Sequence, residues 1–211
     1  MKGKANFWRV LVGTALASAS LALAACASAP AWQQPYALTA APDTQPAGQH
    51  QAGVLRLEAV TAPSWLAGEE YLYRLGYANP QALRPYNDAR WAAAPGQMLT
   101  LLLSQRLRQQ GDWRAVLGPT QAGRPALLLQ LGLQDFTVHY SNATAGEAQI
   151  SCTATLLAAR GYRVLAQKSF AVQAPLPSTG PAAGATAMTR AAQELVAQIG
   201  DWAAQHSPAA D

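Results

Sequence analysis

The first 25 residues have the pattern of a segment that is removed before the protein folds. Lys2, Lys4 and Arg9 make the start basic, and residues 10–25 carry no charge and are rich in Leu, Val and Ala. A membrane-spanning helix needs about 20 predominantly apolar residues, and this run is shorter and poorer in large side chains. The pattern is typical of a secretory signal peptide, so we expect the rest of the chain to fold outside the cytoplasm.

The predicted cleavage site is more specific than a run of small residues. Leu23, Ala24, Ala25 and Cys26 resemble a lipobox. In such a site the cysteine thiol receives a diacylglycerol, the bond before it is cut, and the new N-terminus takes a further acyl chain. An ordinary secretory signal with a chance cysteine is the alternative. An Asp directly after the cysteine would resemble an inner-membrane retention signal, but this position holds Ala27. We therefore expect a lipoprotein on the periplasmic face of the outer membrane. Three acyl chains, at about 0.8 kcal/mol per buried CH₂, would anchor it firmly.

The mature chain is expected to be a short tether followed by one domain. Residues 26–35 are the predicted lipidated tether, and nine residues of chain span at most about 30 Å. Residues 36–211 are long enough to bury one core. Once the signal peptide is removed, 12 basic side chains remain against 11 acidic ones. No basic stripe survives, so nucleic-acid binding is not expected.

Cysteine usage excludes an intramolecular disulfide. The chain has two cysteines, and Cys26 is the one expected to carry lipid. Cys152 then has no partner within the chain. Cys152 falls at the same alternate positions as Ala148, Ile150 and Leu156, as in a strand with one apolar face. We therefore predict that Cys152 is buried in a strand and packs as a small apolar side chain.

Two segments have the apolar spacing of amphipathic helices. Residues 95–110 begin at Pro95, which suits a first helical position, and Gly111 follows as a stop signal. Residues 186–205 are the second. Strand patterns are predicted at residues 36–38, 54–60, 70–76, 81–86, 113–117, 125–138, 147–159 and 162–172. We predict a single-domain α/β fold with a mixed sheet of about five strands covered by the two helices. A parallel pair is expected within residues 54–117, and antiparallel hairpins after it.

The sequence offers little for catalysis or metal binding. His50, His139 and His206 are scattered, and none has a second ligand at a suitable spacing. A Gly-x-Ser-x-Gly nucleophile motif and a phosphate-binding loop are both absent from the sequence. Glu69 and Glu70 are adjacent and would face opposite ways in a strand, so a solvated turn is the plainer interpretation. We expect no enzymatic activity, no metal, and no cofactor beyond the covalent lipid on the cysteine.

Aromatic side chains next to arginine give the candidate contact surface. Trp65 lies beside Pro63 in a predicted turn, and Arg90 and Trp91 precede the first helix. Trp and Arg are enriched among the residues that dominate protein interfaces, so Trp65, Arg90 and Trp91 are candidate partner-binding residues. The alternative is structural, with Trp91 packed under the start of the helix and Trp65 covering an edge of the sheet.

Taken together, these segments resemble the ABC-type transport auxiliary lipoproteins, including PqiC-like proteins associated with MCE-type lipid transport. The resemblance rests on residues 54–57, 62–66, 73–74, 86, 90–91 and 95–99, after 36–38 and before Trp202. Each piece is weak alone, but their order and spacing are fairly specific. One departure is Gly68-Glu69-Glu70-Tyr71, where a more apolar approach to Tyr73-Arg74 is expected. This departure affects the strand register at that point.

The resemblance implies a non-enzymatic auxiliary role in an ABC-driven system. In such a system an inner-membrane permease and ATPase work with an MCE-domain protein that bridges the periplasm, and the lipoprotein would dock that bridge at the outer membrane. Homo-oligomers are possible in such a role. The alternatives are a lipid carrier that encloses its cargo between sheet and helices, and a regulator of another envelope assembly machine. An envelope hydrolase is disfavoured because a nucleophile motif is missing.

Overall fold

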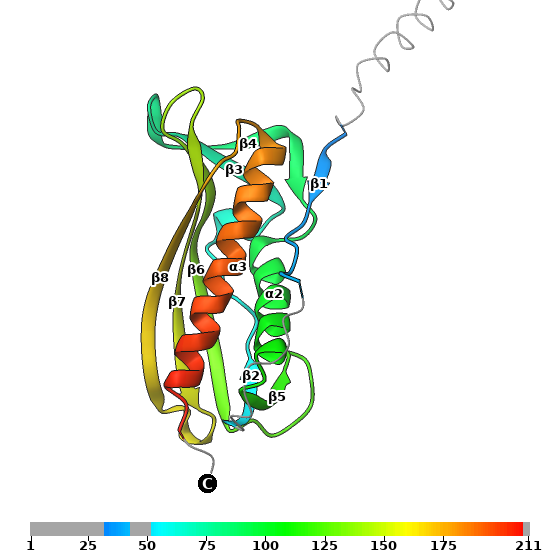
Figure 1. Ribbon diagram of the computed structural model, residues 1–211, viewed down its shortest axis with the longest axis vertical. Coiled ribbons are helices and arrows are strands. Elements are labelled where there is room, and N and C mark those ends of the chain that lie inside the picture. The colour runs from blue at the N-terminus through cyan, green and yellow to red at the C-terminus, as the bar shows by residue number, and fades with distance from the viewer. Residues whose placement is uncertain (1–31, 43–51, 209–211) are drawn as a thin grey trace, which may run out of the picture. The chain divides into compact units, whose positions relative to one another are not determined.

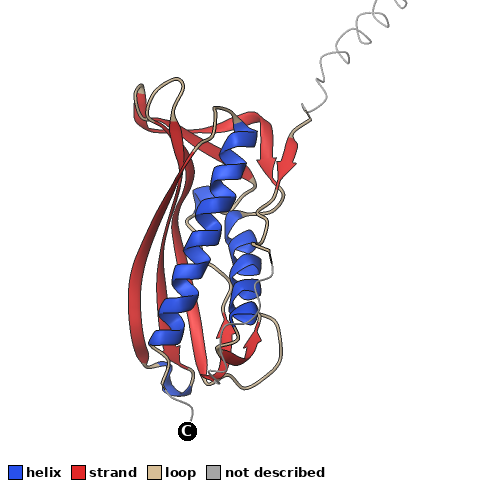
Figure 2. Ribbon diagram, viewed as in Figure 1, coloured by secondary structure: helices blue, strands red, loops and turns tan. Residues whose placement is uncertain are grey.

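The computed structural model describes residues 32–42 and 52–208, and those from Gln33 onward belong to one compact unit. The unit is an eight-stranded mixed sheet with two long helices side by side on one face (Figures 1 and 2). Its elements are β1 (Gln34–Tyr36), β2 (Ala52–Leu57), the 3-10 helix η2 (Ser64–Leu66), β3 (Glu70–Leu75), β4 (Asn79–Trp91), α2 (Pro95–Gln110), β5 (Trp113–Leu117), β6 (Leu127–Tyr140), β7 (Gly146–Ala158), η3 (Arg160–Tyr162), β8 (Val164–Pro175) and α3 (Pro181–Gln205). The predicted fold class is confirmed.

The long strand β6 joins all the others into one sheet. One of its edges pairs with β7 in antiparallel fashion along its whole length, and β7 pairs with β8 in the same way. The other edge is divided, because β2 runs parallel to its first residues and β3 runs parallel to its last. β5 then extends the sheet beyond β2, while β4 and β1 extend it beyond β3. This division explains why eight strands form the sheet where about five were expected.

A β-bulge in β6 lets both halves of the strand face the same core. Leu127, Leu129, Leu131 and Leu133 are buried, as their alternation predicts. The pairing with β7 shifts between Leu133 and Asp135, so the buried apolar positions after the bulge are Phe136, Val138 and Tyr140. An extra residue in one strand of an antiparallel pair changes which face the following side chains occupy.

Cys152 confirms the alternation predicted for β7. Its side chain has no exposed surface, and it is unpaired among the described cysteines. Burial raises the pKa of the Cys152 thiol to about 11, so the group stays protonated at neutral pH. The residue therefore packs as an apolar side chain of the core.

The helices begin and end where local chemistry allows. Helix α2 spans Pro95–Gln110 as predicted, and Gly111 follows it in the left-handed conformation with a φ of +77°. Helix α3 starts at Pro181, before the predicted residue 186, because Pro suits the first turn and the small side chains after it pack closely. Between them the helices bury a stripe of Leu, Met, Ala and Val against the sheet. A fully buried Leu contributes about 1.5–3 kcal/mol to stability.

Several predicted boundaries shift. Strand β4 continues to Trp91 rather than ending at residue 86. Pro85 lies within it, opposite Leu72, at a point that β1 does not reach and where no other described strand pairs with the outer edge of β4. Strand β1 includes Gln34, so the last two residues of the predicted tether already pair with β4.

Some of the sequence predictions concern residues that the structure does not describe. The predicted signal peptide, the lipobox and Cys26 lie outside the described residues, and so does His50. Within the described residues, no helix is long and apolar enough to cross a membrane.

Candidate functional site

Four residues that carry the family resemblance, Tyr36, Tyr73, Tyr86 and Trp91, meet where β3 and β4 join the end of β6. Their rings belong to an aromatic cluster, made of Tyr36, Tyr71, Tyr73, Tyr86, Trp91, Phe136 and Tyr140. At its centre the rings of Tyr71 and Trp91 are 4.1 Å apart between centroids, and Phe136 packs edge-on against Trp91 at 5.3 Å. Such pairs add about 0.5–1.5 kcal/mol beyond the burial of their surface.

Hydrogen bonds tie this cluster to helix α3. The hydroxyls of Tyr86 and Tyr140 are 2.7 Å apart, and the Gly180 N–H donates to Tyr140 at 3.1 Å. The Tyr71 hydroxyl donates to the carbonyl oxygen of Pro181 at 3.2 Å. Burial, followed by the hydrogen bond to Tyr140, raises the pKa of Tyr86 far above its usual value, and burial does the same for Tyr71. Both phenols therefore stay protonated at neutral pH, and they hold the start of α3 against the sheet.

Trp91 belongs to this core and not to the surface. Its side chain has no exposed area, so in this conformation it cannot contact a partner. As in the structural alternative, the Trp91 ring packs inside the protein, and its ring contacts are with Tyr71 and Phe136. Its indole Nε1 is buried without a hydrogen-bond partner in the described part of the chain. The candidate contact surface is thus reduced to Trp65 and Arg90, whose role stays a prediction.

Trp65 is half exposed and packs with an arginine that the sequence did not single out. It lies in η2, with 37% of its surface exposed, while its neighbour Leu66 is buried. The guanidinium carbon of Arg74 lies 5.8 Å from the centre of the Trp65 ring. A cation over an indole face contributes about 0.5–1 kcal/mol at exposed sites. Arg74 thereby limits the positions that the Trp65 ring adopts.

Arg90 is held by the turn that precedes β3. Its Nη1 donates to the Glu69 carboxylate at 2.6 Å and to the Trp91 carbonyl at 3.3 Å. The Trp91 N–H donates in turn to the Glu69 carbonyl at 2.8 Å. Arg90 lies opposite Glu70 on the neighbouring strand. Arg74 is four residues after Glu70 on β3, so the alternation of side chains puts both on the same face of the sheet. We define Trp65, Glu69, Arg74 and Arg90 as the Trp65 surface.

Two members of this surface could not be identified from sequence spacing. Glu69 was interpreted as part of a solvated turn, yet it pairs with an arginine 21 residues later. Arg74 enters from sequence only as part of the Tyr73-Arg74 pair of the family resemblance, with no link to Trp65. An exposed ion pair of this kind contributes about 0–1 kcal/mol.

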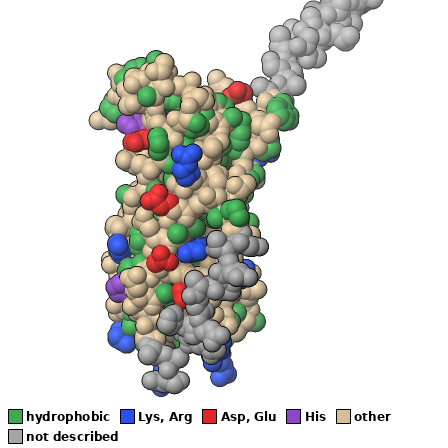
Figure 3. Space-filling view, in the orientation of Figure 1, with side chains coloured by type: hydrophobic (Ala, Val, Ile, Leu, Met, Phe, Trp, Pro, Cys, Tyr) green, Lys and Arg blue, Asp and Glu red, His purple; other side chains and the backbone are tan. Residues whose placement is uncertain are grey.

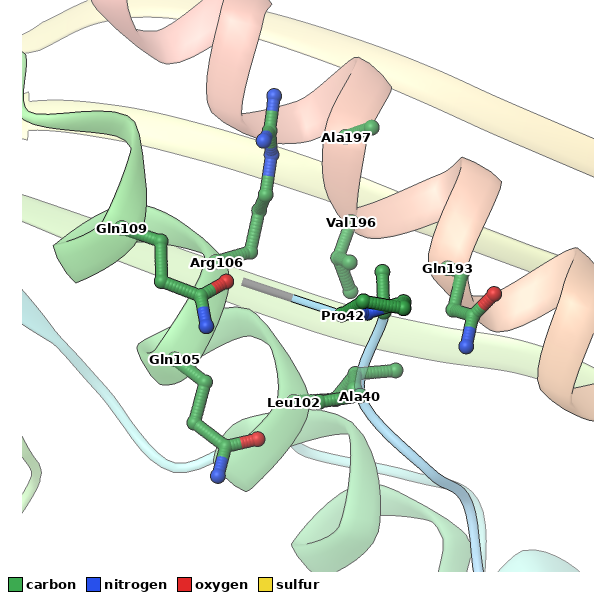
Figure 4. Close-up of a pocket in the computed structure, with 10 residues that line it drawn as sticks. Ala40, Pro42, Leu102, Gln105, Arg106, Gln109, Gln193, Val196 and Ala197 are labelled. Carbon is green, nitrogen blue, oxygen red and sulfur yellow. The ribbon is translucent and has the colours of Figure 1, made fainter. Parts of the chain in front are cut away.

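A small hollow lies between the two helices (Figure 4). It measures about 230 Å³ and is lined by α2, α3 and residues 40–42. Leu102, Val196 and Pro42 supply its apolar side, and Arg106 lies at its margin with Nη2 3.5 Å from a carboxylate oxygen of Asp201. Ligand pockets are typically about 300–1,000 Å³, so this hollow is smaller than a site for a whole lipid molecule.

The described residues contain no group of three or more His, Cys, Asp or Glu that could hold a metal ion. His139 has its Nδ1 3.4 Å from the Gln149 amide nitrogen. The Nδ1 of His206 lies 2.8 Å from the Trp202 carbonyl oxygen, where it caps the end of α3. Each of these histidines therefore has a neighbour that accounts for its position.

Known proteins and structures share the fold and the sequence pattern of this chain. A solved protein from Xanthomonas campestris, assigned to the family DUF330, is 25% identical, with a TM-score of 0.73 over 82% of this chain and 95% of that one. An uncharacterised protein of known structure shares the fold with a TM-score of 0.65 and 18% identity, over 81% of this chain and 98% of that one. No curated relative matches the sequence. The family model described as "ABC-type transport auxiliary lipoprotein component" matches residues 36–200. The chain therefore belongs to the ABC-type transport auxiliary lipoprotein family.

Proposed function

We propose that this protein is a non-enzymatic docking lipoprotein of an MCE-type lipid transport system driven by an ABC transporter. It would be anchored through Cys26 to the periplasmic face of the outer membrane. There it would hold the outer end of an MCE-domain protein that bridges the periplasm. The observation that carries this proposal is the family match over residues 36–200, which assigns an auxiliary lipoprotein role in ABC-type transport.

The geometry of the tether supports a position close to the membrane. Gln34, the first residue of β1, follows Cys26 by eight residues. Eight extended residues reach at most about 28 Å. A domain held this closely stands where a bridge across the periplasm would end.

The Trp65 surface is the proposed contact for that partner. It combines a half-exposed indole ring with two arginines and one carboxylate, and each charged group already has a fixed neighbour. Interfaces gain most from Trp and Arg side chains whose positions are set before binding, because less side-chain entropy is then lost. A partner that buries Trp65 would meet a rigid apolar ring bordered by charges of both signs.

A photo-crosslinking amino acid at position 65 tests this contact in intact cells. The matched control is position 77, because Tyr77 is also an exposed aromatic residue, in the turn between β3 and β4. We expect a covalent adduct with an MCE-domain protein from position 65 and not from position 77. Adducts with a second copy of this chain would instead establish a homo-oligomer. Adducts with a cell-wall or lipopolysaccharide assembly protein would replace the transport proposal by a regulatory one.

A lipid-carrier function is less well supported. The space between sheet and helices is filled by the core, and the hollow between α2 and α3 measures only about 230 Å³. A carrier that encloses its cargo would need a larger cavity. Native mass spectrometry of the full-length protein in mild detergent tests this alternative. A stoichiometric, non-covalent lipid in addition to the covalent anchor would favour a carrier over a docking protein.

A further inference from the structure

Charged side chains are distributed differently on the two faces of the sheet. On the face covered by the helices, Figure 3 shows basic and acidic side chains scattered singly among apolar and polar ones. Elsewhere, a shallow hollow of about 470 Å³ is lined by β2, by the loop before β6 and by the turn between β7 and β8. Arg56, Arg124 and Arg160 line it, with Glu58 and Tyr162. We call these five residues the arginine hollow.

The arginine hollow lies on the face of the sheet away from the helices. Leu128 and Gln130 of β6 line it, and they alternate with Leu127, Leu129 and Leu131, which belong to the core. Successive side chains of a strand point to opposite faces of a sheet. Leu128 is buried although it lies outside that core. The hollow therefore has an apolar floor and a basic rim.

Arg56 is fixed in direction, but its charge is not neutralised by a neighbour. Its Nη2 donates to the carbonyl oxygens of Gln121 at 3.0 Å and Gly123 at 3.1 Å, while its buried Nε has no hydrogen-bond partner. In residues 32–42 and 52–208, no carboxylate lies within 4.0 Å of the guanidinium of Arg56, Arg124 or Arg160. Carbonyl oxygens carry no net charge, so these cations are left to solvent or to a bound anion.

The turn between β7 and β8 holds an exposed ring in an unusual backbone conformation. Tyr162 has a φ of +52°, and no other non-glycine among the described residues has a positive φ. Gly161 before it has a φ of +78°. The left-handed conformation costs a residue with a Cβ roughly 1–2 kcal/mol, and such strain is often found at binding sites. The turn keeps the Tyr162 ring 70% exposed beside Arg160.

We propose that the arginine hollow binds a phosphate group, carried by a phospholipid headgroup or by a free phosphate compound. Guanidinium groups are planar and donate paired hydrogen bonds to phosphate oxygens. Three of them reach the hollow from separate segments, and Glu58 offsets one charge, so an excess of two remains. A phosphate monoester carries about −1.5 to −2 at neutral pH and a lipid phosphodiester about −1, so this excess attracts either. The Tyr162 hydroxyl supplies a further donor at the rim.

The binding test uses the full-length lipidated protein in micelles of a neutral maltoside detergent. One arm titrates inorganic phosphate. The other titrates phosphatidylglycerol incorporated into the micelles, with phosphatidylcholine as the comparison lipid of no net charge. The site variant is Arg124→Gln with Arg160→Gln. The matched control is Arg84→Gln with Arg190→Gln, which removes the same charge from exposed positions on β4 and α3.

We expect the site variant to bind about tenfold more weakly, since two charge-assisted hydrogen-bonding groups are lost, while the control binds like the native protein. Weakening in both arms shows that phosphate itself is recognised. Weakening with phosphatidylglycerol alone identifies a lipid headgroup as the source, and weakening with inorganic phosphate alone identifies a free compound. Absence of binding by the native protein, or equal losses in both variants, would overturn the proposal.

A second variant separates binding from folding. Tyr162→Gly removes the ring and relieves the positive φ, so this protein is expected to be at least as stable as the native one. We expect it to bind more weakly all the same. Binding equal to that of the native protein would exclude Tyr162 from the site. Trp65 does not line the hollow, so either result leaves the proposed docking function standing.

Discussion

The aromatic cluster and the arginine hollow lie at the two ends of β6 and have opposite chemistry. In the aromatic cluster, rings from four strands pack together, four of them buried, and the hydroxyls of Tyr71, Tyr86 and Tyr140 have hydrogen-bond partners. In the arginine hollow, cations from three segments face solvent without a counter-ion among the described residues. The first arrangement stabilises the fold. The second contributes little to stability, which is the usual condition of a binding surface.

The comparison shows that residues which identify a family need not be those that contact its partners. Trp91 carries part of the family resemblance and is a core residue. Arg124 and Arg160 carry none of it and are exposed. The two regions should differ most in how far a substitution lowers the free energy of unfolding.

The largest effect is expected from Trp91→Ala. Removing a fully buried indole that packs on Tyr71 and Phe136 leaves a cavity, and such truncations cost about 3–5 kcal/mol. The free energy of unfolding, measured by urea titration with circular dichroism, should fall by that amount. Trp65→Ala is the control, because its half-exposed ring should cost less than about 1 kcal/mol. Similar losses in both variants would contradict the assignment of Trp91 to the core.

The next largest loss of stability is expected from Gly96→Ala. A Cβ at Gly96 would lie 2.8 Å from the carbonyl oxygen of Val60, which is backbone and cannot easily move. We expect a loss of about 1–3 kcal/mol in the free energy of unfolding, against the usual gain from Ala in a helix. In Gly200→Ala the new Cβ meets only the mobile end of the Gln110 side chain. That control should be neutral or stabilising in the same urea titration.

The buried tyrosines should make stability depend on pH at alkaline values. The pKa values of Tyr71 and Tyr86 are raised in the folded protein, chiefly by burial, so the unfolded chain loses these protons first. Their stabilisation is complete below about pH 10 and decreases as the pH rises above it, by up to about 1.4 kcal/mol per pH unit for each group. Tyr86→Phe should show a shallower decrease. If the two curves stay parallel above pH 10, Tyr86 does not titrate as described.

The smallest effect is expected in the arginine hollow. Arg124→Gln with Arg160→Gln should change the free energy of unfolding by less than about 0.5 kcal/mol, because neither guanidinium has an ion-pair partner in the described residues. Urea titrations at low and high salt would check this. A loss comparable to that of Trp91→Ala would mean that the arginines hold the loop before β6 in place, and the contrast between the two regions would disappear.

Local patterns predicted α2, the end of α3 and the long hairpins correctly. Pro95 and Gly111 bound α2 at the expected residues, since capping depends on the chain immediately around them. Alternation identified the buried positions of β7, including Cys152, because its pairing with β6 and β8 is continuous. The parallel pairing of β2 with β5 followed from the helix between them.

Long-range pairings were beyond the reach of the sequence. The bulge after Leu133 changes the parity of β6, and treating residues 125–138 as one continuous alternating strand did not place it. The ion pair between Glu69 and Arg90 depends on the register of β3 against β4, which shifts irregularly at two points. The arginine hollow is lined by segments separated by more than 30 residues, so spacing alone could not place its members together.

The divided edge of β6 has a consequence for the order in which the chain folds. Strands β2 and β3 do not pair with each other. Each pairs with β6, which begins at residue 127. The pair β2–β5 and the pair β3–β4 can therefore join into one sheet only after β6 has been added to both of them. Closing such long loops is slow. We expect β6 to be the rate-determining segment, so that changes within it delay folding more than equally destabilising changes in β8.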